Sequence, residues 1–231
     1  MQRLYDCAVD TDLLTGMRLA KIALQRDELV VLPTDTVYGL AANAFSHKGV
    51  KALLDAKGRT AQSPPPVLIS NMSQLDALTE SVPQIARSLA NTFWPGALTM
   101  ILKAQPSLQW DLGETKGTVA LRMPDHKIAL ALLEETGPLA VSSANLTGQP
   151  AATTCQQAEA YLGSTVAVYL DGGNSPKGEA STILDLTDLQ DSYDGHGNLT
   201  TTGKIKIVRN GALSAAKIKT IAGDLLEEVG K

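Results

Sequence analysis

The sequence predicts an α/β fold built on a twisted, mixed open sheet with flanking helices. Helical and strand patterns alternate along the whole chain, and no repeat, linker or low-complexity block separates them. Hydrophobic residues make up 44% of the 231 residues but aromatic residues only 4%, so the core must be aliphatic. This length and composition suit one large domain. We expect residues 1–231 to form it, with a short helical tail from about residue 214.

The expected elements follow from apolar periodicity. Helices carry apolar residues three or four positions apart, whereas strands are short β-branched or aliphatic runs bounded by turn residues. In chain order, the helical segments are Leu13–Leu24, Val50–Lys57, Ile85–Phe93, the segment opened by a Thr154 capping box and ended by Gly163, and the tail from Ser214. The strands are Glu28–Leu32, Val67–Ile69, Leu98–Leu102, Thr118–Met123, Leu139–Val141, Val166–Leu170, Ile183–Leu186 and Ile205–Val208. The last two flank a polar, Gly-rich stretch.

Two short segments predict an anion-binding site near the start of the chain. Thr34 and Thr36 follow the first of these strands, so their hydroxyls emerge at a strand end, where open α/β sheets bind ligands. Lys57 lies in the last turn of the next helix, and a left-handed cap at Gly58 would turn Arg59 toward the same region. The alternative is that Lys57 only complements the helix dipole.

The strand Thr118–Met123 predicts a further cation in a binding site. Alternation along the strand puts Arg122 on the same face as Thr118, with the small Ala120 between them. Such a face can form the floor of a cavity that holds a carboxylate or phosphate, because arginine offers a two-pronged donor. The alternative is an ordinary solvent-facing side of a strand.

Neither standard nucleotide-binding fingerprint is present. The run Gly173–Gly178 resembles a phosphate loop, but Glu179 and Ala180 stand where the motif needs Lys and Ser or Thr, and no GxGxxG follows a strand. The polar segment Ser142–Gly148, directly after a strand, can present backbone and side-chain donors to phosphate oxygens. The same residue types also make ordinary loops.

Charge and composition narrow the function classes. A net charge of −4, with scattered Lys and Arg, argues against a broad nucleic-acid surface. No apolar run reaches the ~20 residues of a membrane span and no signal peptide is evident, so we expect a cytoplasmic protein. Cys7 and Cys155 lie outside any disulfide or zinc pattern and are expected to be buried thiols. His47, His126 and His196 are expected to be solvated surface residues.

Seven ordered motifs resemble the YrdC family of threonylcarbamoyl-AMP synthases. They cover about Leu13 to Ser214 and are Pro33–Leu40, Lys57–Arg59, Phe93–Thr99, Thr118–His126, Ser142–Gly148, Ala180–Thr182 and Ile207–Ala212. The resemblance implies a large concave cavity and the condensation of L-threonine, bicarbonate and ATP into threonylcarbamoyl-AMP and pyrophosphate. That product serves threonylcarbamoyladenosine modification of tRNA, which the protein would reach indirectly through a downstream threonylcarbamoyl transferase. The chain resembles the single-domain kind of this family.

The resemblance also implies roles for individual residues. Lys57 and Arg59 would be catalytic, compensating phosphate charge together with Arg209 and a Mg²⁺ ion carried by the nucleotide, without a protein metal site. Threonine would be bound by Thr36, Arg122, Val141 and Ser181. ATP would be bound by Arg59, Ser63, Thr118, Ser143, Asn145, Ala151 and Arg209. The chain departs from the usual family residues at Ser63, Leu68, Val141, Ser142 and Ala151, which leaves substrate contacts open at those positions.

Two other classes compete with this interpretation. One is a double-stranded RNA or tRNA-binding module without adenylate synthesis, against which the acidic net charge speaks. The other is a carbamoyl-transfer domain of the hydrogenase-maturation type. That class resembles longer chains with Cys-rich zinc motifs, which this sequence lacks.

Overall fold

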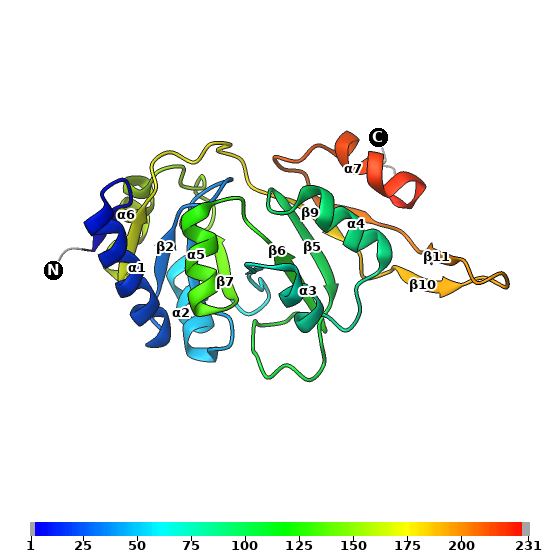
Figure 1. Cartoon of the computed structure of the whole chain (residues 1–231). Helices are drawn as coiled ribbons and strands as arrows, with labels where there is room; N and C mark the ends of the chain where they lie inside the picture. The colour runs from blue at the N-terminus through cyan, green and yellow to red at the C-terminus, as the bar shows by residue number, and fades with distance from the viewer. Residues whose placement is uncertain (1–2, 228–231) are drawn as a thin grey trace.

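A ten-stranded mixed sheet with helices packed on it runs through the computed structural model, which describes residues 3–227 (Figure 1). The strands are β1 (Leu4–Asp6), β2 (Val30–Leu32), β3 (Gly39–Asn43), β4 (Val67–Leu68), β5 (Leu98–Lys103), β6 (Thr118–Arg122), β7 (Leu139–Ser143), β8 (Val168–Asp171), β9 (Thr182–Asp185) and β12 (Lys206–Arg209). The α-helices are α1 (Asp10–Gln25), α2 (His47–Lys57), α3 (Met72–Leu78), α4 (Gln84–Phe93), α5 (Lys127–Thr136), α6 (Cys155–Leu162) and α7 (Ala215–Ala222). Short 3-10 turns, η1 (Gly163–Thr165) and η2 (Gly223–Leu225), follow α6 and α7.

The strand order is β1-β8-β2-β3-β7-β4-β6-β5-β9-β12, with parallel and antiparallel neighbours. The expected mixed sheet is therefore confirmed. Strand β4 has only two residues, yet it pairs with β7 on one side and with β6 on the other. It joins two parts of the sheet, which we call the covered half (β1, β8, β2, β3 and β7) and the open half (β6, β5, β9 and β12).

Helices cover both faces of the covered half. Alternate residues of β2 belong to different hydrophobic clusters, since Val30 and Leu32 pack with residues of α1 and α5, whereas Val31 packs with residues of α2 and α6. Every β2 residue is fully buried, which explains why this strand reads as a continuous apolar run.

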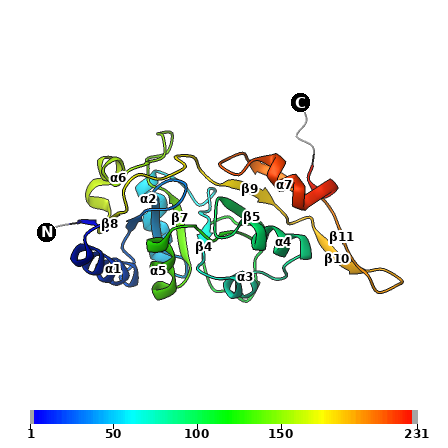
Figure 2. The same cartoon turned by 45° about the horizontal axis from the view of Figure 1, so that its top comes forward.

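The open half has helices on one face. Leu98, Met100 and Leu102 of β5 point into the core beneath α3 and α4, while Thr99 and Ile101 alternate with them on the other side. The same alternation in β6 turns Leu121 inward and Arg122 outward. No helix packs on the outward face in the described part of the chain (Figure 2). The cavity described below lies on that face.

Local sequence signals specify most element ends. Gly58 ends α2 in the left-handed conformation, with φ of 65°, as expected. The side chain of Thr154 caps α6, and that of Ser214 caps α7, which confirms a helix after residue 214. Residues 228–231 of the expected tail lie outside the described residues. The single-domain organisation stays a prediction, supported by one sheet that holds strands from both ends of the described chain.

Several features differ from the sequence expectations, which also did not include β1, β3, α3 and α5. The polar stretch between β9 and β12 forms a two-stranded antiparallel hairpin, β10 (Gln190–Tyr193) with β11 (Leu199–Thr202), which projects from the end of the open half (Figure 1). His126 is half-buried rather than solvated, and its burial lowers the pKa of the imidazole although Asp35 and Asp125 oppose this. Cys155 is buried as expected, but Cys7 is only half-buried.

Over residues 3–227, no helix has the length and hydropathy needed to cross a membrane.

Candidate active site

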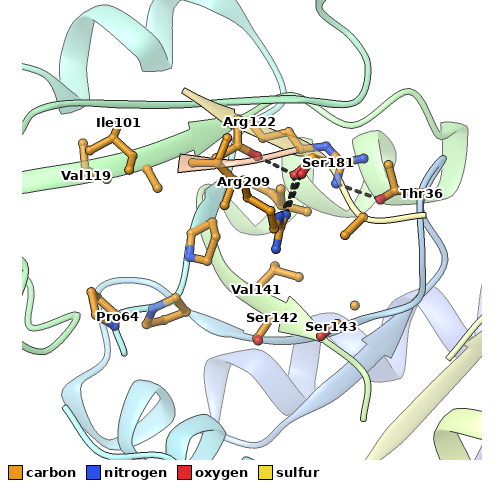
Figure 3. Close-up of a pocket in the computed structure, with 18 of the residues that line it drawn as sticks. Thr36, Pro64, Ile101, Val119, Arg122, Val141, Ser142, Ser143, Ser181 and Arg209 are labelled. Carbon is orange, nitrogen blue, oxygen red and sulfur yellow. Dashed lines mark hydrogen bonds between the residues drawn. The ribbon is translucent and has the colours of Figure 1, made fainter. Parts of the chain in front are cut away.

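A cavity of about 320 Å³ lies between the open face of β5, β6 and β9 and the adjoining ends of β3 and β7. Figure 3 shows polar groups gathered at one end, around Arg122, Thr36, Ser181 and Arg209, and apolar groups at the other, around Pro64, Ile101 and Val119. A site with a few convergent polar groups and an apolar wall is typical of small-molecule binding. We call the polar end the recess and define it by Thr36, Thr99, Arg122, Val141 and Ser181.

Arg122 is fixed at the floor of the recess by three protein acceptors. Its Nε donates to the carbonyl of Gly96 at 2.9 Å, and one terminal nitrogen donates to the hydroxyl of Thr36, also at 2.9 Å (Figure 3). The other terminal nitrogen forms a short ion pair with the carboxylate of Asp35. Burial lowers the pKa of Arg122, yet an arginine guanidinium stays charged at neutral pH. The cation expected from strand alternation is therefore present and pre-oriented.

Asp35 was not expected as a site residue, and it proves to be the counter-ion of the recess. Its side chain is buried and accepts from Arg122, from Lys177 at 2.9 Å and from the backbone amide of Asp125 at 3.1 Å. Burial alone would raise the pKa of this carboxyl, but Arg122 and Lys177 outweigh that effect and lower it. Asp35 therefore remains ionised at neutral pH.

Ser181, which the family resemblance assigns to threonine, is hydrogen-bonded to Arg209, which the resemblance assigns to ATP. Its hydroxyl lies 2.8 Å from that of Thr99, and Arg209 donates to both the carbonyl and the hydroxyl of Ser181, at 2.8 Å and 3.0 Å from one nitrogen. Thr99 belongs to the expected motif Phe93–Thr99 but was not singled out. Arg209, expected on the nucleotide side, thus borders the residue expected to bind threonine.

Lys57 lies in a different environment from the one expected. Its side chain is 1% exposed, and its ammonium donates to the carbonyls of Ser143 and Asn145, the latter at 2.7 Å, and to the Asn145 side-chain oxygen at 3.3 Å. Burial and the nearby Arg59 lower the pKa of Lys57 to about 8. The ammonium therefore holds the loop that follows β7 and does not line the cavity.

Arg59 remains the cation at the cavity rim. The left-handed turn at Gly58 directs it away from the α2 axis, and its guanidinium donates to the hydroxyls of Thr147 at 3.2 Å and Ser142 at 3.4 Å. Because both partners are neutral hydroxyls, the positive charge of Arg59 is not cancelled by these contacts. It can compensate an anionic ligand in the cavity.

The structure brings together most of the sequence-predicted residues. Those that line the cavity are Thr36, Arg59, Thr118, Arg122, Val141, Ser143, Ser181 and Arg209. Four others lie outside its lining, namely Lys57, Ser63, Asn145 and Ala151. Among the positions that depart from the family pattern, Leu68, Val141 and Ser142 do line the cavity. Substrate contacts at these three positions can therefore differ from those that the usual family residues would make.

The cavity lining contains no Asp or Glu among the described residues, and over residues 3–227 no cluster of His, Cys, Asp or Glu could hold a metal ion. It also presents no residue pair of the kind that activates a nucleophile. What it offers is positioning and positive charge, from Arg59, Arg122 and Arg209. Chemistry between two bound reactants that carry negative charge fits this arrangement.

Comparison with known proteins agrees with these features. The Sua5/YciO/YrdC family model, described as telomere recombination, matches residues 22–194. A Mycobacterium leprae protein with a provisional assignment as a threonylcarbamoyl-AMP synthase is 44% identical over 96% of this chain and 95% of its own length. The threonylcarbamoyl-AMP synthase of Bacillus subtilis is also 44% identical, over 73% of this chain and 49% of its own.

Solved structures show the same fold. Pyrococcus abyssi Sua5, in a crystal structure with L-threonine, superposes with a TM-score of 0.81 at 33% identity over 91% of this chain. This chain spans only 58% of that Sua5 chain. Escherichia coli YciO superposes with a TM-score of 0.72 at 22% identity, covering 92% of this chain and 97% of its own, which supports the fold alone.

Proposed function

Because this chain belongs to the Sua5/YciO/YrdC family, we propose that it is an L-threonylcarbamoyladenylate synthase, a nucleotidyltransferase of tRNA modification. The enzyme joins L-threonine, bicarbonate and ATP into threonylcarbamoyl-AMP and releases pyrophosphate. The single observation that carries this proposal is one cavity with a guanidinium and hydroxyl recess at one end, an apolar wall at the other and two further arginines beside it.

Threonine fits the recess. Arg122 has a buried, oriented guanidinium suited to a carboxylate, while the hydroxyls of Thr36, Thr99 and Ser181 surround the same space. Val141 supplies an apolar contact for the threonine methyl group. The Pyrococcus abyssi protein, at 33% identity, has been crystallised with L-threonine.

ATP fits the rest of the cavity. Pro64, Ile101 and Leu112 form an apolar wall for the adenine ring, while Arg59, Ser143 and Arg209 lie where the phosphates would pass on to the recess. The absence of carboxylates from the described lining means that Mg²⁺ would be carried by phosphates and water, as this ion prefers. With the two substrates bound in this way, the α-phosphate would lie near the threonine amine.

The reaction needs no side-chain nucleophile. The threonine amine and bicarbonate give a carbamate with loss of water, and a carbamate oxygen then attacks the α-phosphorus while pyrophosphate leaves. Arg59 and Arg209 compensate the negative charge that builds up during attack, and Arg122 keeps threonine in place. Lys57 donates to the carbonyl of Ser143 at the end of β7 and so helps to present Ser143 to the phosphates.

The product is unstable toward water, so we propose transfer to a downstream threonylcarbamoyl transferase that modifies tRNA in the cytoplasm. This chain would then reach tRNA only indirectly. The comparisons support the synthase over the RNA-binding alternative, because the curated relatives are named for adenylate synthesis.

The proposal is tested by incubating the full chain with ATP, L-threonine and bicarbonate. Pyrophosphate is measured enzymatically and threonylcarbamoyl-AMP by mass spectrometry, with each substrate omitted in turn. We expect both products only in the complete mixture. Equal pyrophosphate release without bicarbonate would contradict the proposed reaction, and double-stranded RNA binding without release would favour the alternative.

A further inference from the structure

Asp35 contacts two cations from distant parts of the chain although it is not itself part of the cavity lining. One carboxylate oxygen accepts from Arg122 of β6 and from the backbone amide of Asp125, and the other accepts from Lys177 at 2.9 Å. The side chain of Asp35 is 4% exposed, whereas that of Lys177 is 40% exposed. A buried carboxylate that is paired with two cations holds both of them firmly in position.

The hydrogen bonds of Arg122 show what Asp35 does for the recess. A guanidinium has five N–H groups, one on Nε and two on each terminal nitrogen. Gly96, Thr36 and Asp35 each take one hydrogen from a different nitrogen, so one hydrogen on each terminal nitrogen remains for a ligand. Two donors on different terminal nitrogens are able to bind the two oxygens of one carboxylate. Asp35 is the only charged acceptor among the three.

Lys177 links the same carboxylate to the loop that crosses the molecule. Residues 172–181 join β8 of the covered half to β9 of the open half, along the upper edge in Figure 1. The loop is held at its start by the Tyr38 hydroxyl, which donates to the Gly173 carbonyl at 2.6 Å, and in its middle by Lys177. It ends at Ser181, inside the recess.

We propose that Asp35 is a positioning residue for threonine: it orients the free donors of Arg122 and, through Lys177, holds the loop that brings Ser181 into the recess. This inference rests on the proposed function. It assigns a role to two residues that do not line the cavity, one of them on an exposed loop.

Charge alone would give the opposite effect, which makes the inference testable. Asp35 is negative and lies beside the proposed site of a substrate carboxylate, so its removal would strengthen the attraction between Arg122 and threonine if electrostatics decided the outcome. Removal of a positioning group would weaken threonine binding despite the gain in positive charge. The sign of the change therefore separates the two roles.

The experiment compares Asp35→Ala, Asp35→Asn and Lys177→Met with the wild-type full chain. Lys51→Met is the matched control, since Lys51 pairs with Asp55 on the exposed surface of α2 at 2.6 Å. The Kd of L-threonine and that of ATP are measured by calorimetric titration, the KM of threonine and kcat by pyrophosphate release, and folding by thermal unfolding.

We expect Asp35→Ala to raise the threonine Kd more than about tenfold, with a larger change in KM than in kcat. Asp35→Asn restores an acceptor of the same shape and should recover part of that loss. Lys177→Met should raise the threonine Kd about three- to tenfold, because it releases the loop but leaves Arg122 paired. Lys51→Met should change nothing, and the ATP Kd should stay within about twofold in all variants.

An unchanged or lower threonine Kd in folded Asp35→Ala would overturn the proposal, as would equal losses of threonine and ATP binding. Should Asp35→Ala fail to fold, Asp35→Asn and Lys177→Met decide, and an unchanged threonine Kd in both overturns it. If the wild-type chain binds no threonine at all, the proposed function fails instead.

Discussion

The two halves of the sheet are built from similar strands but are covered differently. The covered half has α1 and α5 on one face and α2 and α6 on the other, so its strands are apolar on both sides. Over residues 3–227, the open half has helices (α3, α4 and α7) on one face only. On its free face, hydroxyl and guanidinium groups such as Thr99 and Arg122 alternate with buried aliphatic residues. The cavity lies on the face that no described helix covers, and strand alternation determines which side chains line it.

Because of this difference, we expect the covered half to determine mainly the stability of the fold and the open half to determine mainly ligand binding. Substitutions in the covered half, apart from the cavity-lining residues of β3 and β7, should lower the free energy of unfolding and leave ligand affinity intact. Substitutions on the free face of the open half should do the reverse, except where a buried ion pair links the two.

The largest effect is expected from a core truncation in the covered half. Leu132 of α5 is fully buried among α1, β2 and β7, so Leu132→Ala should lower the free energy of unfolding by about 2–5 kcal/mol. Chemical denaturation measures this, and Ile101→Ala on the cavity wall is the matched control. Ile101→Ala should weaken ATP binding more than it lowers stability. Equal effects of both variants on ATP affinity would break the comparison.

The next effect separates the two cations of the motif at the end of α2. Arg59→Ala should lower turnover about ten- to a thousandfold and change the free energy of unfolding by less than about 0.5 kcal/mol, because Arg59 faces the cavity rim. Lys57→Met should lower that free energy by about 1–3 kcal/mol, since it removes the buried ammonium that donates to the carbonyls of Ser143 and Asn145. Turnover and denaturation are measured for both. A stable Lys57→Met protein would show that Lys57 does not act as a structural clamp.

A third effect compares the two arginines that meet at Ser181. Arg122→Ala should weaken threonine binding by roughly 1.5–3 kcal/mol with a smaller change for ATP, whereas Arg209→Ala should mainly weaken ATP binding. Because Arg209 also holds Ser181, we expect some loss of threonine affinity there as well. Calorimetric titration of each ligand into each variant measures the changes. If Arg122→Ala lost ATP instead of threonine, the two ends of the cavity would have to be exchanged.

The smallest effect is a pH dependence of ATP affinity. Since the pKa of Lys57 is lowered to about 8, its ammonium is mostly protonated at neutral pH and loses its proton as the pH rises above that value. The neutral amine has one donor fewer, so it can no longer donate to all three of its acceptors on Ser143 and Asn145. The ATP Kd of the wild type should rise severalfold from about pH 7 to pH 9. The same change in Lys57→Met would assign it to another group.

Local signals in the sequence predicted much of this molecule. The cap at Gly58 and the alternation that turns Arg122 outward depend on neighbours within a few residues, and both are confirmed. The hairpin β10–β11 was missed because its strands are exposed and polar, without the apolar alternation that marks a strand.

Contacts between distant segments were beyond the reach of the sequence. The same helix end would suit a Lys57 that faces phosphate or one that reaches the loop after β7, and only the fold decides between them. Asp35 pairs with Arg122 and Lys177, which are distant in the sequence. His126 is half-buried by tertiary packing that no local sequence pattern reveals. The roles of the predicted site residues stay predictions.

The cavity on the free face of the open half should bind threonine in its recess while ATP fills the rest. A crystal structure of the chain with L-threonine and a non-hydrolysable ATP analogue tests it directly. We predict the threonine carboxylate on the two free donors of Arg122 and the α-phosphate between Arg59 and Arg209. Threonine bound away from Arg122, or a nucleotide bound outside this cavity, would contradict the account.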